Sequence, residues 1–76
     1  MQELIEYLVR ELVDDPDSVR IEPVEDQGYT VYQVNVAQAD LGKVIGRRGR
    51  IANALRIVAK AAALRSRART SVEIIS

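Results

Sequence analysis

The sequence contains no cysteine, histidine, tryptophan or phenylalanine, and only two prolines. Without cysteine and histidine the chain can form no disulfide and no ordinary zinc site, and it lacks every thiol nucleophile and every Ser-His or Cys-His catalytic pair. Apolar runs are far shorter than the roughly 18 residues of a membrane-spanning helix, and no signal-peptide pattern opens the chain. We therefore expect a soluble, cytoplasmic protein without enzymatic activity, metal or cofactor.

The sequence has one dense cluster of carboxylates, at Asp14, Asp15 and Asp17. Their spacing is not that of an EF-hand calcium loop, and the adjoining Pro16 places them on a turn. This cluster is the strongest catalytic or metal-binding candidate that the chain offers, and it supports neither activity. We expect no small-molecule substrate.

The length of 76 residues allows one small domain, which we place at 1–76. Hydrophobic residues make up 47% and charged residues 29%, which is typical of a globular chain rather than a disordered one. At this size the burial of a core only narrowly outweighs the entropy lost on ordering the chain.

Net charge is zero, but the two halves of the chain are oppositely charged. Residues 1–40 contain two arginines and ten carboxylates, a net charge of −8, whereas residues 41–76 contain nine cations and Glu73 alone, a net charge of +8. The halves could pair with each other, or the basic half could face phosphate groups. The pI of 6.2 does not by itself indicate a nucleic-acid-binding protein.

Hydrophobic periodicity and turn residues predict six elements. In order, these are a helix over 2–13, a strand near 19–24, a strand over 29–37, a short helix over 41–45, a helix over 50–65 and a strand over 70–75. The fold class is therefore α+β, with the order α-β-β-α-α-β and the helices packed on one face of a three-stranded sheet.

Individual residues sharpen this prediction. Pro23 favours an edge position for the first strand, since proline cannot donate to a central ladder. Asp40 is a candidate N-cap of the short helix. In the long helix, the predicted buried stripe is Ile51, Leu55, Val58 and Ala62, with Asn53, Arg56, Lys60 and Arg67 on the opposite side.

The segment Gly46-Arg47-Arg48-Gly49 separates the two later helices. The first glycine can end a helix with positive φ, and neither glycine presents a Cβ to a ligand. Gly49 stands at the start of the long helix, where unpaired N–H groups and the helix dipole favour an anion. Lys43 and Arg50 flank the segment, which indicates a phosphate-binding loop.

Two other types of loop fit this segment less well. A Walker-type P-loop has a different spacing and ends in Lys-Ser or Lys-Thr, which this loop lacks. The turn of a helix-turn-helix DNA reader does not require two glycines around two cations.

The run from Leu41 to Arg50 resembles the V-I-G-x-x-G core of a KH domain. The order of elements resembles the type II arrangement, in which a helix and a strand precede the minimal unit. The segment Leu12-Val13-Asp14-Asp15-Pro16-Asp17 and the run from Ala59 to Ala63 are similar to the small stand-alone bacterial KH proteins of the KhpA family. The resemblance covers nearly the whole chain, and Arg47 stands where many relatives have lysine.

The resemblance implies binding of single-stranded RNA, with the loop clamping the backbone of about four nucleotides. The implied RNA-binding residues are Lys43, Val44, Ile45, Gly46, Arg47, Arg48, Gly49, Arg50 and Ile51. Bases would lie in an apolar groove between the helices and the neighbouring strand. Val44, Ile45 and Ile51 are candidates for that groove, although aliphatic residues at such positions more often belong to the core. The three tyrosines all precede the basic half, and a KH groove needs no stacking rings, unlike an RNP-type sheet or an OB-fold.

The resemblance also implies assembly into a homodimer, or into a heterodimer with a second KH protein of the Jag type. The residues Ile57, Ala61 and Leu64 form an extra apolar flank on the long helix, which meets either the first helix or a partner. We expect an RNA-binding protein acting in post-transcriptional regulation. A module that mainly recruits a protein partner is the alternative.

Overall fold

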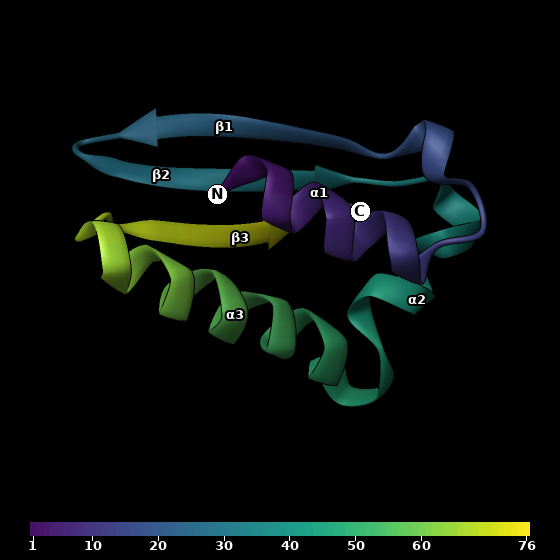
Figure 1. Ribbon diagram of the computed structural model, residues 1–76. Coiled ribbons are helices and arrows are strands. Elements are labelled where there is room, and N and C mark those ends of the chain that lie inside the picture. Colours follow the sequence, from purple (N-terminus) through teal and green to yellow (C-terminus); the bar gives the residue numbers. More distant parts are fainter.

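The computed structural model describes all 76 residues, Met1–Ser76. Its helices and strands follow in the predicted order (Figure 1), namely α1 Gln2–Leu12, β1 Arg20–Asp26, β2 Tyr29–Asn35, α2 Leu41–Ile45, α3 Arg50–Ser66 and β3 Thr70–Ile74. Three 3₁₀ turns join them, at Pro16–Ser18, Gln38–Asp40 and Arg47–Gly49. The predicted α+β class is confirmed. None of the helices combines the length and the apolar character that crossing a membrane requires.

The sheet has the strand order β1-β2-β3, so that β2 is central and the other two strands are edges. β1 and β2 pair antiparallel around a turn at Gln27 and Gly28, whose φ values of 51° and 81° match a type I′ hairpin. β3 pairs in parallel with β2. Pro23 lies in β1 opposite Tyr32, which confirms that its strand is an edge.

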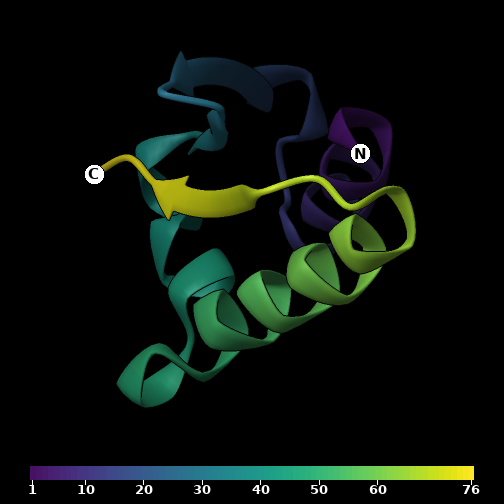
Figure 2. The ribbon, with the colours of Figure 1, turned by 90° about the vertical axis from the view of Figure 1, so that its left-hand side faces the viewer.

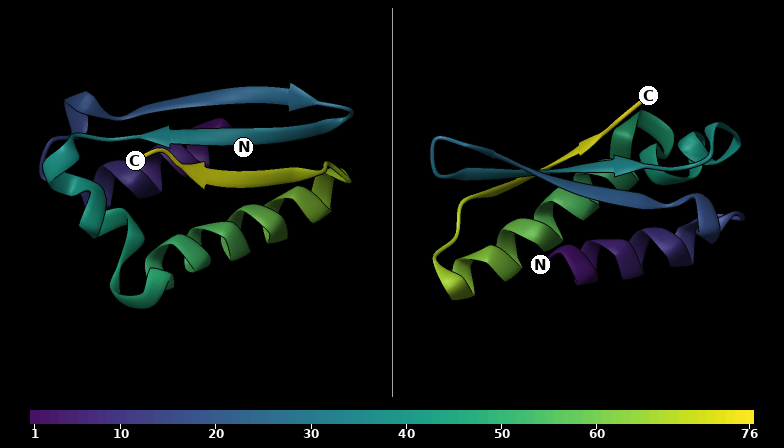
Figure 3. Two further views of the ribbon diagram at one scale, coloured as in Figure 1. Left: turned by 180° about the vertical axis from the view of Figure 1, so that it is seen from behind. Right: turned by 90° about the horizontal axis from the view of Figure 1, so that it is seen from above.

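Helices α1 and α3 cover the same face of the sheet, as the end-on view in Figure 2 and the two views in Figure 3 show. One hydrophobic core fills the space between the layers, formed by Ile5, Val9, Val19, Ile21, Val34, Val44, Leu55, Ala59 and Val72. Alternate residues from β2 onward face the core, because Val34 is fully buried while Tyr32 and Val36 are partly buried against it.

The buried side of α3 differs from the prediction. Its buried residues are Ala52, Leu55, Ala59 and Ala63, whereas Ile51 is half-buried and Val58 is 41% exposed. Leu55 belongs to both the predicted and the observed set, and the other three buried positions each follow a predicted one by one residue. The buried side is therefore turned around the helix by less than the roughly 100° that separates successive residues. The alanine side faces the sheet because short side chains let the helix backbone approach it closely. The larger aliphatic residues are therefore turned toward α1 and solvent.

Candidate nucleic-acid interface

The loop between α2 and α3 is built on three residues with positive φ. Gly46 ends α2 with φ 74° and ψ 175°, and its N–H donates to the carbonyl of Gly42 at 2.9 Å. Arg48 follows with φ 56°, and Gly49 precedes α3 with φ 71°. Glycine adopts such angles without steric cost, so the two glycines set the shape of the loop. The chain reverses direction here at the outer end of the helical layer (Figure 1).

The two glycines have different local environments. A Cβ added to Gly46 would lie 2.7 Å from Cγ1 of Ile51 and 3.0 Å from its backbone nitrogen. A Cβ added to Gly49 would meet no atom within 4 Å. Gly46 therefore lets the loop pack closely on the first turn of α3, while Gly49 leaves the backbone open to an approaching ligand.

The loop is exposed and its cations are unpaired. Arg47, Arg48 and Arg50 are all exposed, and none has a carboxylate oxygen within 4.0 Å. The N–H groups of Gly46, Gly49 and Arg50 donate to backbone carbonyls, but those of Arg47 and Arg48 have no backbone acceptor. Of the five loop amides from Gly46 to Arg50, the arrangement thus leaves two free N–H groups beside three guanidinium groups. Both kinds of group bind phosphate oxygens well.

The apolar residues around the loop do not share one surface. Val44 is fully buried in the core, which corrects its assignment as an RNA contact. Ile45 is 36% exposed, and Ile51 is half-buried against the core. Only Ile45 and Ile51 keep surface that a ligand could touch.

An apolar pocket with a volume of about 420 Å³ lies between α1 and α3. The groove that the resemblance implies between the helices and a strand is a different surface and stays a prediction. The residues that line the pocket are Leu8, Glu11, Leu12, Arg50, Ile51, Ala54, Leu55 and Val58. The alanines of α3 are buried against the sheet, and this orientation leaves Ile51 and Val58 on the side that faces α1.

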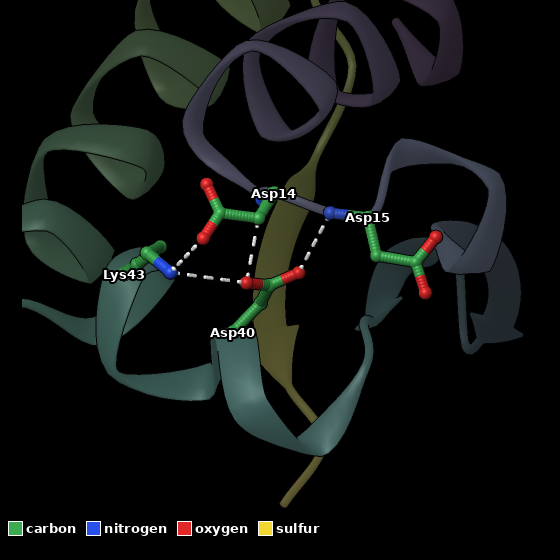
Figure 4. A network of polar contacts seen from close by, with 4 residues as sticks. All are labelled: Asp14, Asp15, Asp40 and Lys43. Atoms are coloured by element: carbon green, nitrogen blue, oxygen red, sulfur yellow. Dashed lines mark hydrogen bonds and ion pairs between the residues drawn. The ribbon is translucent and has the colours of Figure 1, made fainter.

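Lys43 belongs to a polar network that joins α2 to the end of α1 (Figure 4). Its ammonium lies 2.6 Å from a carboxylate oxygen of Asp14 and 3.3 Å from one of Asp40. Asp40 also accepts hydrogen bonds from the backbone N–H of Asp15 at 3.0 Å and of Asp14 at 3.3 Å. The predicted N-cap is therefore wrong in one respect: Asp40 precedes α2, but its side chain makes no capping hydrogen bond. Its carboxylate instead accepts hydrogen bonds from the backbone of the segment that follows α1.

These contacts shift two pKa values. Burial acts to raise the pKa of Asp40, whose side chain is 1% exposed, but the hydrogen bonds from Asp15, Asp14 and Lys43 outweigh it and lower that pKa. The hydrogen bonds to Asp14 and Asp40 raise the pKa of Lys43. Both groups are therefore held in their charged forms. No pattern within the sequence pairs these residues, because the contact joins positions up to 29 residues apart.

Arg56 makes a second contact that the sequence did not reveal. Its Nε donates to the carbonyl of Val72 in β3 at 3.1 Å, and its Nη1 donates to Oδ1 of Asn53 at 3.1 Å. Asn53 and Arg56 therefore lie on the side of α3 that flanks the free edge of β3.

Comparisons with known proteins agree with this geometry. The family model described as "KhpA/KhpB, KH domain" matches residues 2–74. The chain is 46% identical over 74 residues to RNA-binding protein KhpA of Treponema pallidum, covering 97% of this chain and 92% of that one. It is 45% identical over 75 residues to the KhpA of Clostridium acetobutylicum, covering 99% and 100%. It is 44% identical over 73 residues to that of Borreliella burgdorferi, covering 96% and 89%. No solved structure matches it.

Proposed function

Because the chain belongs to the KhpA/KhpB family of KH domains, we propose that it binds single-stranded RNA without catalysing a reaction, and that the Gly46–Gly49 loop holds the RNA backbone. The observation that carries this proposal is the loop itself, in which unpaired guanidinium groups stand beside free amides on an exposed bend. The relatives are named RNA-binding proteins, which supports the same ligand class. The order of α1 and β1 before the β2-α2-α3-β3 unit supports the type II arrangement.

The free N–H groups of Arg47 and Arg48 would donate to the oxygens of one phosphate. The guanidinium groups of Arg47, Arg48 and Arg50 would contact that phosphate and its neighbours, and the missing Cβ of Gly49 lets the backbone come close. About four nucleotides fit such a clamp. With about three phosphates neutralised, log K should fall with log salt at a slope near −2.

Lys43 has a different role in this proposal from the loop arginines. Its ammonium is engaged by Asp14 and Asp40, so contact with a phosphate would require it to give up an ion pair. We assign it to positioning, because it ties the helix that ends at Gly46 to the segment that follows α1. The residues that bind RNA are then Gly46 to Arg50, with Ile45 and Ile51 at the border of the site.

A second role, in protein assembly, is supported by the surface of α1 and α3. Ile57 is 68% exposed and Leu64 is 76% exposed. The predicted apolar flank on α3 therefore does not meet α1. Leu4, Tyr7 and Leu12 of α1 are also exposed, so the outer surface of these two helices carries apolar side chains of the kind that mark protein interfaces. We propose that it joins two copies, or one copy and a KH protein of the Jag type. Pairing would raise the weak affinity of a single module.

The test is the loop variant Arg47→Asp with Arg48→Asp, measured by fluorescence anisotropy against labelled single-stranded RNA. Aspartate tolerates the left-handed conformation at residue 48, so far-UV circular dichroism should be unchanged while binding is lost. The charge-matched control is Arg10→Asp with Arg65→Asp, which alters exposed arginines outside the loop. Wild-type affinity in the loop variant, or equal losses in both variants, would rule out the clamp. A role of this protein in post-transcriptional regulation requires RNA binding, so it depends on the same result.

A further inference from the structure

We propose that the face of the sheet opposite the helices binds the loop end of a second copy of this chain, so that the protein covers its own Gly46–Gly49 loop until RNA displaces the contact. The contact is head-to-tail, because each copy offers its sheet to one neighbour and its loop to another. It forms between two protein surfaces and needs no RNA. Only its displacement by RNA rests on the function proposed above.

One face of the sheet is left open by the helices, and we call it the outer face. Helix α1 packs on β1 and helix α3 packs on β3, both from the other side (Figure 2). Side chains alternate between the two sides of a strand. Val34 and Val72 point toward the helices and are buried, whereas Val31, Gln33 and Glu73 point to the outer face and are not. The outer face is therefore accessible to a partner.

The strand registers place an apolar pair beside an acidic row on the outer face. Val24 of β1 stands opposite Val31 of β2. Two residues further along the strands, Glu22 and Glu73 flank Gln33 from the two edge strands. Neighbouring strands are about 4.8 Å apart, so the backbones of these two glutamates are about 10 Å apart. The centre of the outer face thus offers an apolar pair next to two carboxylates.

The carboxylates of the outer face have no cation of their own. No lysine or arginine nitrogen lies within 4.0 Å of Glu22, Asp26 or Glu73, all of which are exposed. The acidic and basic halves of the chain pair only through Lys43. Arg20, at the start of β1, donates instead to two backbone carbonyls. The carboxylates of the outer face are therefore available to the cations of another molecule.

The loop end of the molecule is complementary to the outer face. Arg47, Arg48 and Arg50 are exposed and have no carboxylate partner, and Ile45 is an exposed aliphatic residue beside them. Guanidinium groups bind carboxylates through charge-assisted hydrogen bonds, and Ile45 matches the apolar pair of the outer face. The net charge of zero removes the overall repulsion that would otherwise keep two copies apart.

The two complementary surfaces cannot meet within one molecule. The loop joins α2 to α3 and belongs to the helical layer, while the outer face lies on the other side of the sheet (Figures 1 and 2). A second copy brings the two surfaces together. The contact uses neither the pocket nor the exposed apolar residues of α1 and α3, so it is separate from the assembly proposed for those helices.

The outer face and RNA compete for the same arginines. Both present anionic oxygens, and a guanidinium group that holds a carboxylate of a neighbouring copy is not free for a phosphate. Surface charges are screened beyond about 10 Å at 0.1 M salt, so the contact weakens as salt is added. We therefore expect self-association at low salt that single-stranded RNA reverses.

Charge reversal on either surface tests the contact. The face variant is Glu22→Lys with Glu73→Lys, and the loop variant is Arg47→Asp with Arg48→Asp. The swapped variant carries all four changes, so its two surfaces are again complementary and its net charge is again zero. Far-UV circular dichroism checks that each variant is folded.

The matched control for the face variant is Glu3→Lys with Asp17→Lys. These two carboxylates are exposed and lie outside the outer face, on α1 and on the turn that follows it. Their reversal changes the net charge by the same amount and leaves both complementary surfaces intact. Overall repulsion acts equally in the control and in the face variant, so a difference between the two reports the surface.

Sedimentation velocity over a concentration series gives the strength of self-association. At about 0.02 M salt, the face and loop variants should self-associate on the order of tenfold more weakly than the wild type, and the swapped variant should recover. Addition of oligo(U)4 should dissociate the wild type. At about 0.3 M salt the contact is screened, so assembly through α1 and α3 is measured under that condition.

Amide chemical shifts locate the contact. When the isotope-labelled face variant is mixed with the unlabelled loop variant, the intact loop of the first meets the intact outer face of the second. The resonances from Gly46 to Arg50 of the labelled protein should therefore shift. If the swapped variant does not fold, this mixture decides, and unshifted loop resonances overturn the proposal.

The proposal is also overturned if the wild type shows no association that salt removes, if the control loses as much as the face variant, or if a folded swapped variant stays dissociated. Binding of oligo(U)4 to copies that remain associated would overturn it as well. Failure of the proposed function gives a different result, because oligo(U)4 would then not bind while self-association would still differ between the variants.

Discussion

The ammonium of Lys43 lies 2.6 Å from a carboxylate oxygen of Asp14, and this ion pair joins two parts of the chain that are 29 residues apart. Asp40 lies below the pair and accepts hydrogen bonds from both connected segments (Figure 4). The network holds the start of α2 against the end of α1. Because α2 has only five residues and leads directly into Gly46, its placement also sets the position of the loop.

Asp40 should make the stability of the protein depend on pH at the acid end. The pKa of its carboxyl is lower in the folded state than its ordinary value of 3.8, so its contribution is complete above that value and is lost as pH falls through the folded pKa. We expect Asp40→Asn to lower the urea midpoint at pH 7, and to converge on the wild type at low pH. The control is Asp17→Asn, whose exposed side chain makes no hydrogen bond. Parallel pH profiles for Asp40→Asn and the wild type would contradict this account.

Lys43 should act at the opposite end of the pH range. Its pKa is raised above 10.5 in the folded state, so its contribution is complete below that value and is lost as pH rises through the folded pKa. Lys43→Met should therefore flatten the alkaline limb of a urea-midpoint profile while leaving the acid limb present. Since the side chains of Lys43 and Asp14 are partly exposed, Asp14→Asn should cost far less stability at pH 7 than Asp40→Asn.

The two loop glycines should respond differently to alanine. Gly46 has φ 74° and ψ 175°, angles that are nearly exclusive to glycine, and its new Cβ would meet Ile51 at 2.7 Å. Gly46→Ala should therefore lower the free energy of unfolding by about 3 kcal/mol. Gly49→Ala meets no atom, and its cost should be about 1 kcal/mol. Urea denaturation gives both values, and equal losses would show that the packing on Ile51 is unimportant.

The same pair of variants separates folding from binding. Gly49→Ala keeps the fold but places a methyl group on the open surface of the loop, so it should weaken RNA binding at temperatures where the protein is fully folded. A variant that binds RNA like the wild type would show that the backbone does not approach the ligand at Gly49.

Local signals in the sequence predicted the order of elements. Pro16 ends the first helix, Gly28 closes the hairpin, and Gly46 and Gly49 separate the last two helices, and each of these effects acts within a few residues. The loop could be recognised for the same reason, since its glycines and cations are adjacent in the chain. The features of the loop that the structure confirms are therefore those that are set by residues adjacent in the chain.

The features that the sequence did not predict depend on distant partners. Which side of α3 is buried is decided by how closely the helix approaches the sheet, so Ala52 and Ala59 replace Ile51 and Val58 in the core. The same orientation of α3 leaves larger aliphatic side chains around the apolar pocket beside α1. The hydrogen bond from the backbone N–H of Asp15 to the carboxylate of Asp40 joins the segment after α1 to the segment before α2, and these two segments are close only in the folded chain.

The apolar surface of α3 gives a prediction for assembly. Ile57 and Leu64 are exposed, so Ile57→Glu with Leu64→Lys should change the free energy of unfolding by no more than about 0.5 kcal/mol. Multi-angle light scattering should nevertheless show a lower mass than for the wild type. Val24→Lys on β1 serves as a control, because this residue is also exposed but lies on another face. A wild type that is monomeric at high concentration would contradict self-association and leave a second KH protein as the partner.

Arg67→Gly should stabilise the protein although it removes a charged side chain. The left-handed backbone at Arg67 strains any residue with a Cβ, so glycine there should raise the free energy of unfolding by about 0.5–1 kcal/mol. Arg65→Gly, two residues earlier and inside the helix, should lower it by about 1 kcal/mol. Opposite signs at neighbouring arginines would identify the backbone as the cause, whereas a loss in both would mean that the Arg67 side chain contributes more to the fold than its conformation costs.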